Sequence, residues 1–147
     1  MEARARVSGG LLLAVALAAA GGCARSPTEQ ALRERIGAMQ AAVERREVSA
    51  FIEGVDEDFV GVGGMDRDSL RNLVRIHVLR NARIGATTGP LSVQVEGEVA
   101  TVDFDAVLTG SQGTLIPERA QAYRIRTHWR FEDGDWRVVV ADWEPVL

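Results

Sequence analysis

Asp142 is the residue of this 147-residue sequence whose type and position most directly suggest chemistry. Alternation along the last two expected strands puts its carboxylate on an otherwise apolar face, where a charge is costly unless it is paired or hydrogen-bonded. Tyr123 and Thr127 are its diagonal neighbours on the facing strand. Together these groups could hold the polar head of a ligand, or do acid–base work through a carboxylate with a raised pKa. A second interpretation stays open, in which Asp142 lies at the rim of the sheet and caps a loop amide or a helix end.

His77 is the second candidate, because it lies at the centre of an apolar helical stripe. We expect this helix over about residues 67–82, with Asp66 as its N-cap. The histidine could carry a proton near neutral pH, or it could equally be a satisfied core residue. One histidine and one aspartate are too few ligands for a metal, so we expect no metal site and no cofactor.

The expected register between the last two strands determines which face of the sheet Asp142, Tyr123 and Thr127 lie on. A turn at Asp133–Gly134 predicts that the residues facing one another are Phe131 and Trp136, Trp129 and Val138, Thr127 and Val140, and Ile125 and Asp142. Trp129 and Trp136 are then expected in the core, with Trp129 also lining any pocket, and Trp143 on the outer face. This register assumes that neither strand contains a bulge, which would turn every residue beyond it to the other face.

An earlier hairpin and the helices before it would complete the domain. In "LSVQVEGEVATVDFDAVLTG" (91–110), a turn at Gly97–Glu98 sets Val95 opposite Ala100 and Val93 opposite Val102 on one face. Ahead of it, a capping box at Ser26 and an apolar stripe predict an amphipathic helix. A shorter helix from near Ser49 and a short strand, "DFVGVGG", follow.

The outer face of the last strands carries a row of arginines: Arg124, Arg126 and Arg130. Asp103 and Asp105 share this face on the preceding strand and could form cross-strand ion pairs with them. Two interpretations remain open. The face could be solvated, or it could bind a partner or a second copy of the chain, with Val139 and Trp143 as apolar anchors beside the arginines.

The first residues read as a targeting segment rather than part of the fold. Arginines precede an apolar run of about ten residues and then small residues, as in a secretory signal peptide (1–22). The lone cysteine, Cys23, follows at once, and residues 20–23 resemble the lipobox of bacterial lipoproteins. That resemblance implies acylation of Cys23, a short tether over 23–26, and anchoring in the cell envelope. Ala24 rather than aspartate after the cysteine favours the outer membrane, facing the periplasm.

Composition limits the remaining part to one domain, residues 27–147. The sequence is 46% hydrophobic and 26% charged, which is ordinary for a globular protein. A net charge of −4 without a basic block makes nucleic acid a poor partner, so none is expected.

The order of elements and the end of the sequence resemble a known superfamily. Helices followed by a curled sheet ending in "YRIRTHWRFEDGDWRVVVADW" (123–143) are similar to nuclear transport factor 2-like (NTF2-like) proteins, which include ketosteroid isomerase, scytalone dehydratase and SnoaL-like cyclases. The resemblance covers about residues 27–145. It implies an α+β, cone-shaped fold, with N-terminal helices packed on a curved antiparallel sheet around a pocket. Members often form dimers through the outer face of the sheet.

Function is less constrained, because this superfold hosts many unrelated activities. Our first hypothesis is a membrane-anchored, non-catalytic domain that binds a small apolar ligand with a polar group, or a protein, and forms a homodimer. The alternative is an isomerase, dehydratase or cyclase that uses Asp142, Tyr123 and His77. The acidic pair that ketosteroid isomerase chemistry requires has no counterpart on the strands facing Tyr123, which argues against that activity.

Overall fold

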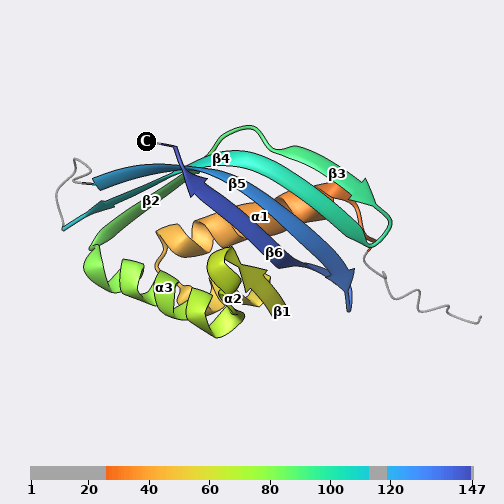
Figure 1. Ribbon diagram of the computed structural model, residues 1–147, viewed down its shortest axis with the longest axis horizontal. Coiled ribbons are helices and arrows are strands. Elements are labelled where there is room, and N and C mark those ends of the chain that lie inside the picture. The colour runs from red at the N-terminus through yellow and green to blue at the C-terminus, as the bar shows by residue number, and fades with distance from the viewer. Residues whose placement is uncertain (1–25, 113–118, 147) are drawn as a thin grey trace, which may run out of the picture.

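The computed structural model describes residues 26–112 and 119–146. Three helices, α1 (Glu29–Glu44), α2 (Val48–Glu53) and α3 (Arg67–Arg80), lie on one side of a curved sheet (Figure 1). The strands are β1 (Val55–Gly61), β2 (Arg83–Thr88), β3 (Ser92–Glu96), β4 (Val99–Ser111), β5 (Arg119–Glu132) and β6 (Asp135–Pro145), and a 3₁₀ turn, η1 (Val62–Gly64), follows β1. Within these described residues, no helix is both long and apolar enough to cross a bilayer.

The sheet has the order β1-β6-β5-β4-β2, and β3 pairs with the other end of β4. The β3–β4 hairpin has the expected register, with Val95 opposite Ala100 and Val93 opposite Val102. The expectation of a purely antiparallel sheet is wrong for one strand, since β1 runs parallel to β6. Strand β2 was not predicted, because glycine, alanine and two threonines give residues 83–88 no alternating pattern. The result is an α+β fold with helices on a curved mixed sheet.

The last hairpin follows the prediction near its turn and departs from it further on. Phe131 faces Trp136 and Trp129 faces Val138, as expected. The next pair is His128 with Val140, so Val139 is an extra residue on β6, a β-bulge. Beyond it, every side chain of β6 points to the face opposite the predicted one.

The core lies between α1, α2 and the inner face of the sheet. It is centred on Trp136, which is 1% exposed and whose indole N–H donates to the Thr28 carbonyl. Trp129 is also buried, as predicted, and α1 contributes Leu32, Ile36 and Met39. Helix α1 begins two residues later than the capping box predicts, because Thr28 rather than Ser26 caps it. Among the described residues, the buried apolar side chains fall between Leu32 and Ala141.

Helix α3 is held at its ends. Asp66 caps its first turn as predicted, accepting from the Ser69 amide. The Arg67 guanidinium donates to the carbonyls of Ile52 and Val55, which ties the start of α3 to α2 and β1.

At the other end of α3, Arg46 acts in the same way. Its guanidinium donates to the Val78 and Ala82 carbonyls, and so caps the last turn. Val78 is the only buried residue of α3. The helix therefore packs on α2 and on the edge strand β1, and a space remains between it and the central strands of the sheet.

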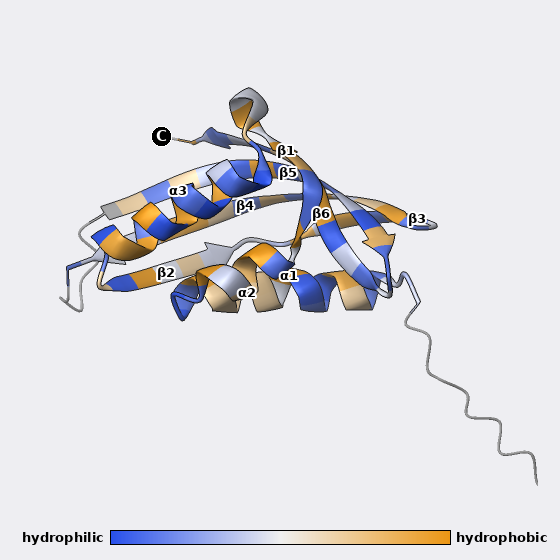
Figure 2. Cartoon of the chain, turned by 90° about the horizontal axis from the view of Figure 1, so that it is seen from below, coloured by the Kyte–Doolittle hydropathy of each residue, from blue (hydrophilic) through white to orange (hydrophobic). Residues whose placement is uncertain are grey.

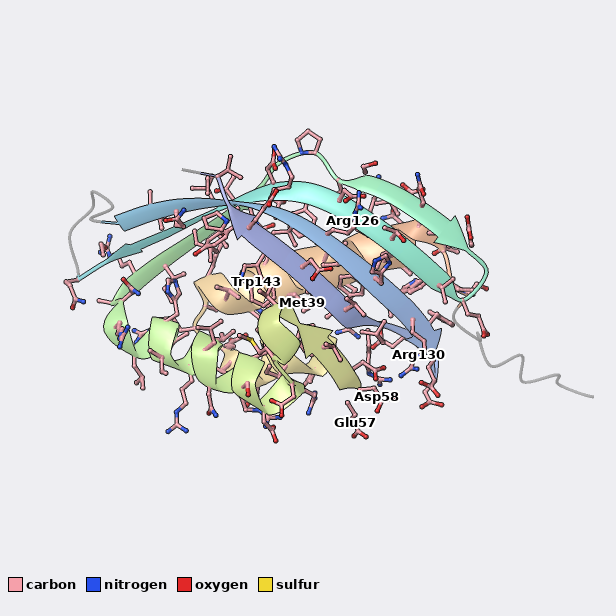
Figure 3. All side chains as sticks on the ribbon, in the orientation of Figure 1. Met39, Glu57, Asp58, Arg126, Arg130 and Trp143 are labelled. Carbon is pink, nitrogen blue, oxygen red and sulfur yellow. The ribbon has the colours of Figure 1, made fainter. Side chains whose placement is uncertain are left out.

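Salt bridges from Arg130 of β5 to two aspartates of β1 help to hold β1, the edge strand of the sheet. Arg130 of β5 donates to Asp56 at 2.7 Å and to Asp58 at 3.3 Å, and Figure 3 shows its side chain pointing toward Asp58. Burial alone would raise the pKa of Asp56, but hydrogen bonds from the Asp58 amide and from Arg130 outweigh burial and lower it. Because the folded state holds this carboxylate ionised more strongly than the unfolded state does, the pair stabilises the fold above about pH 4.

We therefore expect Asp56→Asn to lower the free energy of unfolding at pH 7, and the difference from the wild type to shrink as the pH falls from 5 to 3. Asparagine keeps an acceptor for the Asp58 amide, so the substitution removes mainly the charge. Denaturant unfolding at each pH measures the difference. Asp58→Asn is the control, because that side chain is 82% exposed and its removal should matter little. A difference for Asp56→Asn that grows toward acid pH would contradict this assignment.

Candidate functional site

A cavity of about 770 Å³ lies between the three helices and the inner face of the sheet. This volume is within the range of small-molecule sites. Most of its lining is apolar, and Figure 2, which views the molecule from below, shows hydrophobic segments on α1 and α3. Apolar contributors are Ile36, Met39 and Val43 of α1, Phe51 of α2, Phe59 of β1, Leu70, Leu73 and Val74 of α3, and Phe104, Ile125, Trp129, Val138 and Trp143 of the sheet. Leu73 and Ile76, which are 46% and 45% exposed, form part of its mouth.

The structure brings four of the five predicted pocket residues to this cavity. Tyr123, Thr127 and Trp129 line it from β5, and His77 lines it from α3. The Thr127 hydroxyl is already occupied, because it donates to the Val102 carbonyl and accepts from the Trp129 indole. Thr127 and Trp129 therefore shape the wall, while Tyr123 and His77 keep polar atoms available for a ligand.

His77 has the most distinctive environment of these residues. Its Nε2 atom is buried and has no hydrogen-bond partner among the described residues. Burial lowers the pKa of His77, which keeps the ring neutral at physiological pH. An unpaired buried polar atom is uncommon and calls for a ligand, a water or a strained alternative.

Asp142 is not in the cavity, and its predicted position is wrong. The bulge at Val139 turns it to the outer face, where it is exposed and pairs in register with Arg126. Two strands with an unbroken register would have placed it inside, as alternation predicts. The cavity thereby loses the carboxylate that the sequence assigned to it.

Trp143 is likewise on the opposite face from the one predicted. It lines the cavity and packs close to Gly61, where an added Cβ would lie 3.1 Å from its ring. Figure 3 shows it on the side of the sheet that faces Met39, while Arg126 lies on the other side. Trp143 is therefore a wall of the cavity and not the outer-face anchor of an interface. Val139 is half-buried beside His128 on the outer side.

The predicted cross-strand pairs on the outer face are present. Arg126 binds Asp103 at 2.6 Å, and Arg124 lies 3.8 Å from Asp105 and 3.6 Å from Glu144. Exposed pairs of this kind contribute about 0–1 kcal/mol each. Arg130 is engaged with β1, as described above. Whether this face binds a second copy of the chain stays a prediction.

Several polar residues of the cavity were not predicted. The Gln40 side chain of α1 donates to the Ala86 carbonyl at 2.6 Å and accepts from Thr88. Asn81, which is 5% exposed, donates to the His77 carbonyl and lies close to Gly110. Arg80 also lines the cavity. The helical spacing of His77 and Arg80 could have indicated that they share a face. Nothing in the sequence connects Gln40 with β2, a strand that the sequence does not predict.

The structure has the NTF2-like fold. It resembles Bd1075 of Bdellovibrio bacteriovorus with a TM-score of 0.69 and 11% identity over 79% of this chain, which spans 41% of that protein. It resembles an NTF2-like protein of unknown function from Pseudomonas putida (TM-score 0.67, 16% identity, 79% of this chain and 84% of the other). A proposed dehydratase of the NTF2-like family from Streptomyces avermitilis matches with a TM-score of 0.67 and 16% identity over 80% of this chain and 95% of the other.

These likenesses concern the fold alone, since the identities are low. No family model matches the sequence, and no curated protein is similar to it in sequence. The superfamily resemblance predicted from the last strands is confirmed at the level of the fold, and it transfers no activity.

The bulge makes a testable distinction between two adjacent residues. We expect Trp143→Ala to lower the free energy of unfolding by about 2 kcal/mol, less than the roughly 3–5 kcal/mol for a fully buried tryptophan. Asp142→Ala should change it by less than about 0.5 kcal/mol, as exposed substitutions do. Chemical denaturation compares the two. The reverse order of effects would restore the unbulged register.

Proposed function

We propose that the domain binds a small, mostly apolar molecule in the cavity between α3 and the sheet, without acid–base chemistry of its own. One observation carries this proposal. The cavity of about 770 Å³ is lined mainly by apolar side chains, and none of its described lining residues is an aspartate or a glutamate. Each 100 Å² of apolar ligand surface removed from water there would contribute about 2.5 kcal/mol before the entropic costs of binding.

The alternative of an isomerase, dehydratase or cyclase loses its proposed general base. The arrangement required Asp142 beside Tyr123 and His77, and Asp142 lies on the opposite face of the sheet. The name of the Streptomyces avermitilis protein suggests dehydration, but only the fold is shared. Of the three residues, His77 and Tyr123 remain at the cavity, where they suit the binding of a polar group.

Filling the cavity with a larger side chain should weaken ligand binding. Ala106 is 7% exposed and lines the cavity from β4, whereas Val107, the next residue, is 39% exposed and does not line it. We expect 1-decanol to alter the fluorescence of the segment 26–147, because Trp129 and Trp143 form part of the wall. Ala106→Phe should weaken this binding at least about tenfold by occupying the space.

Val107→Phe is the matched control and should bind decanol as the wild type does. Thermal unfolding of both variants separates loss of the cavity from loss of the fold. Equal effects of the two substitutions, or decanol that leaves the wild-type fluorescence unchanged, would contradict a ligand-binding cavity.

We further propose that the domain is tethered to the cell envelope through acylated Cys23, facing the periplasm from the outer membrane. Residues 1–25, which include the expected signal peptide and Cys23, lie outside the described residues. The support is the sequence pattern, together with the first helix, which begins at Glu29. Such a tether would hold the domain within a few residues of the bilayer.

Expression in a diderm bacterium with an alkyne fatty acid tests the tether. We expect the full chain to incorporate the label and to fractionate with the outer membrane, since more than one acyl chain gives stable anchoring. Cys23→Ala should abolish both, whereas Ser26→Ala should alter neither. Label that persists in Cys23→Ala, or a wild-type chain that never incorporates it, would refute the proposal.

A further inference from the structure

The polar groups of the cavity are gathered near one end. On β5, Gln121 faces Leu108 of β4 and Tyr123 faces Ala106, in the part of the sheet next to the end of α3, where Asn81 lies against Gly110. Trp129 is six residues beyond Tyr123, about 20 Å along the strand. The lining beside Trp129 is apolar and includes Val138, its partner across the strands. Trp143 lies nearer to Tyr123, because it pairs with Ile125. A ligand that fits both ends is amphipathic.

The described residues that line the cavity carry positive charge and no negative charge. Arg80 is the permanently charged side chain among the described lining residues, and no acidic side chain accompanies it there. Several arginines elsewhere in the described residues are paired with carboxylates, among them Arg126 with Asp103 and Arg130 with Asp56. Within residues 26–112 and 119–146, no ion pair is found for the Arg80 guanidinium. A negative group at the mouth would meet a cation without having to displace a carboxylate.

Hydrogen-bond donors face the same end of the cavity. His77 and Arg80 are three residues apart on α3, which places them on one face about 5–6 Å apart at their Cβ atoms. Among the described residues, the buried His77 Nε2 has no hydrogen-bond partner. The Tyr123 hydroxyl likewise makes no hydrogen bond with any of them. A neutral imidazole with its proton on Nε2, a phenol and a guanidinium can all donate to an acceptor.

The carbonyl groups at the C-terminus of α3 would not repel an anion bound beside Arg80. A helix C-terminus carries partial negative charge on its last carbonyls. In this helix Arg46 donates to the Val78 carbonyl, Asn81 to that of His77, and Gln112 to that of Arg80. Side-chain donors thus satisfy these acceptors, and one of the donors is itself a cation.

We propose that the cavity binds an amphipathic anion whose carboxylate or phosphate head lies beside Arg80 and His77 and whose apolar body extends toward Trp129 and Val138. The inference rests on the proposed function and names its ligand class. The head gains charge-assisted hydrogen bonds to the guanidinium, and the body is removed from water by the apolar walls. A carboxylate and a phosphate are both anionic hydrogen-bond acceptors, so a simple carboxylate serves as the probe.

Three ten-carbon probes that differ only in their heads test the proposal: decanoate, 1-decanol and decylamine. Titrated into the segment 26–147 at pH 7 and followed by tryptophan fluorescence, decanoate should bind about tenfold more tightly than decanol, and decylamine most weakly. Arg80→Gln should remove the preference for decanoate, so that decanoate and decanol bind about equally.

Arg75→Gln is the control, because Arg75 is exposed on the same helix and does not line the cavity. It should leave all three affinities as in the wild type. Equal affinities for decanoate and decanol would overturn the anionic head and leave the ligand-binding function standing. If none of the three probes binds, the proposed function itself fails. An effect of Arg75→Gln as large as that of Arg80→Gln would overturn the site and indicate attraction to the surface charge.

Discussion

Two arginine side chains hold α3 near its ends. Arg67 donates to carbonyls of α2 and β1, and Arg46 donates to the carbonyl of Val78 in the last turn and to that of Ala82 just after the helix. A helix with one buried residue gains little from packing, and isolated helices of this length are marginal in water. The hydrogen bonds from these two arginine side chains to backbone carbonyls therefore fix the position of α3. Because it is fixed there and does not settle onto β5 and β6, part of their inner face, at Tyr123, Ile125 and Trp143, stays only partly covered. The cavity is a consequence of this arrangement.

Charge is divided between the two faces of the sheet. Asp103, Asp105 and Asp142 are on the outer face, where two of them pair with arginines of β5. The inner face keeps apolar side chains and a few uncharged polar groups. Burying an isolated carboxylate in such surroundings would cost several kcal/mol. A cavity of this kind suits the holding of an apolar body better than proton transfer between paired acids.

The sequence predicted most of the fold, because alternation and helical periodicity are local signals. The turns at Gly97–Glu98 and Asp133–Gly134, the stripe of α1 and the Asp66 cap all appear where they were expected. Strand β2 was missed because its small and polar residues carry no pattern, and its pairing with β4 depends on distant residues.

The candidate site was less predictable for one physical reason. A bulge changes the parity of every residue beyond it, and Val139, Val140 and Ala141 look alike to a pattern of hydrophobicity. That single extra residue exchanged the positions of Asp142 and Trp143. His77, Tyr123, Thr127 and Trp129 lie on the near side of the bulge or on another element, and they reached the cavity as predicted.

The central claim is that the space under the sheet is open and accepts an apolar body. Intermolecular nuclear Overhauser effects between a bound ten-carbon chain and assigned methyl groups measure this directly. We expect contacts from the alkyl chain to the methyl groups of Ile36, Leu70 and Val138, which line the cavity, and none to Val99 on the outer face. Contacts confined to Val99 and Val107, or no contacts to the inner methyl groups at saturating ligand, would contradict it.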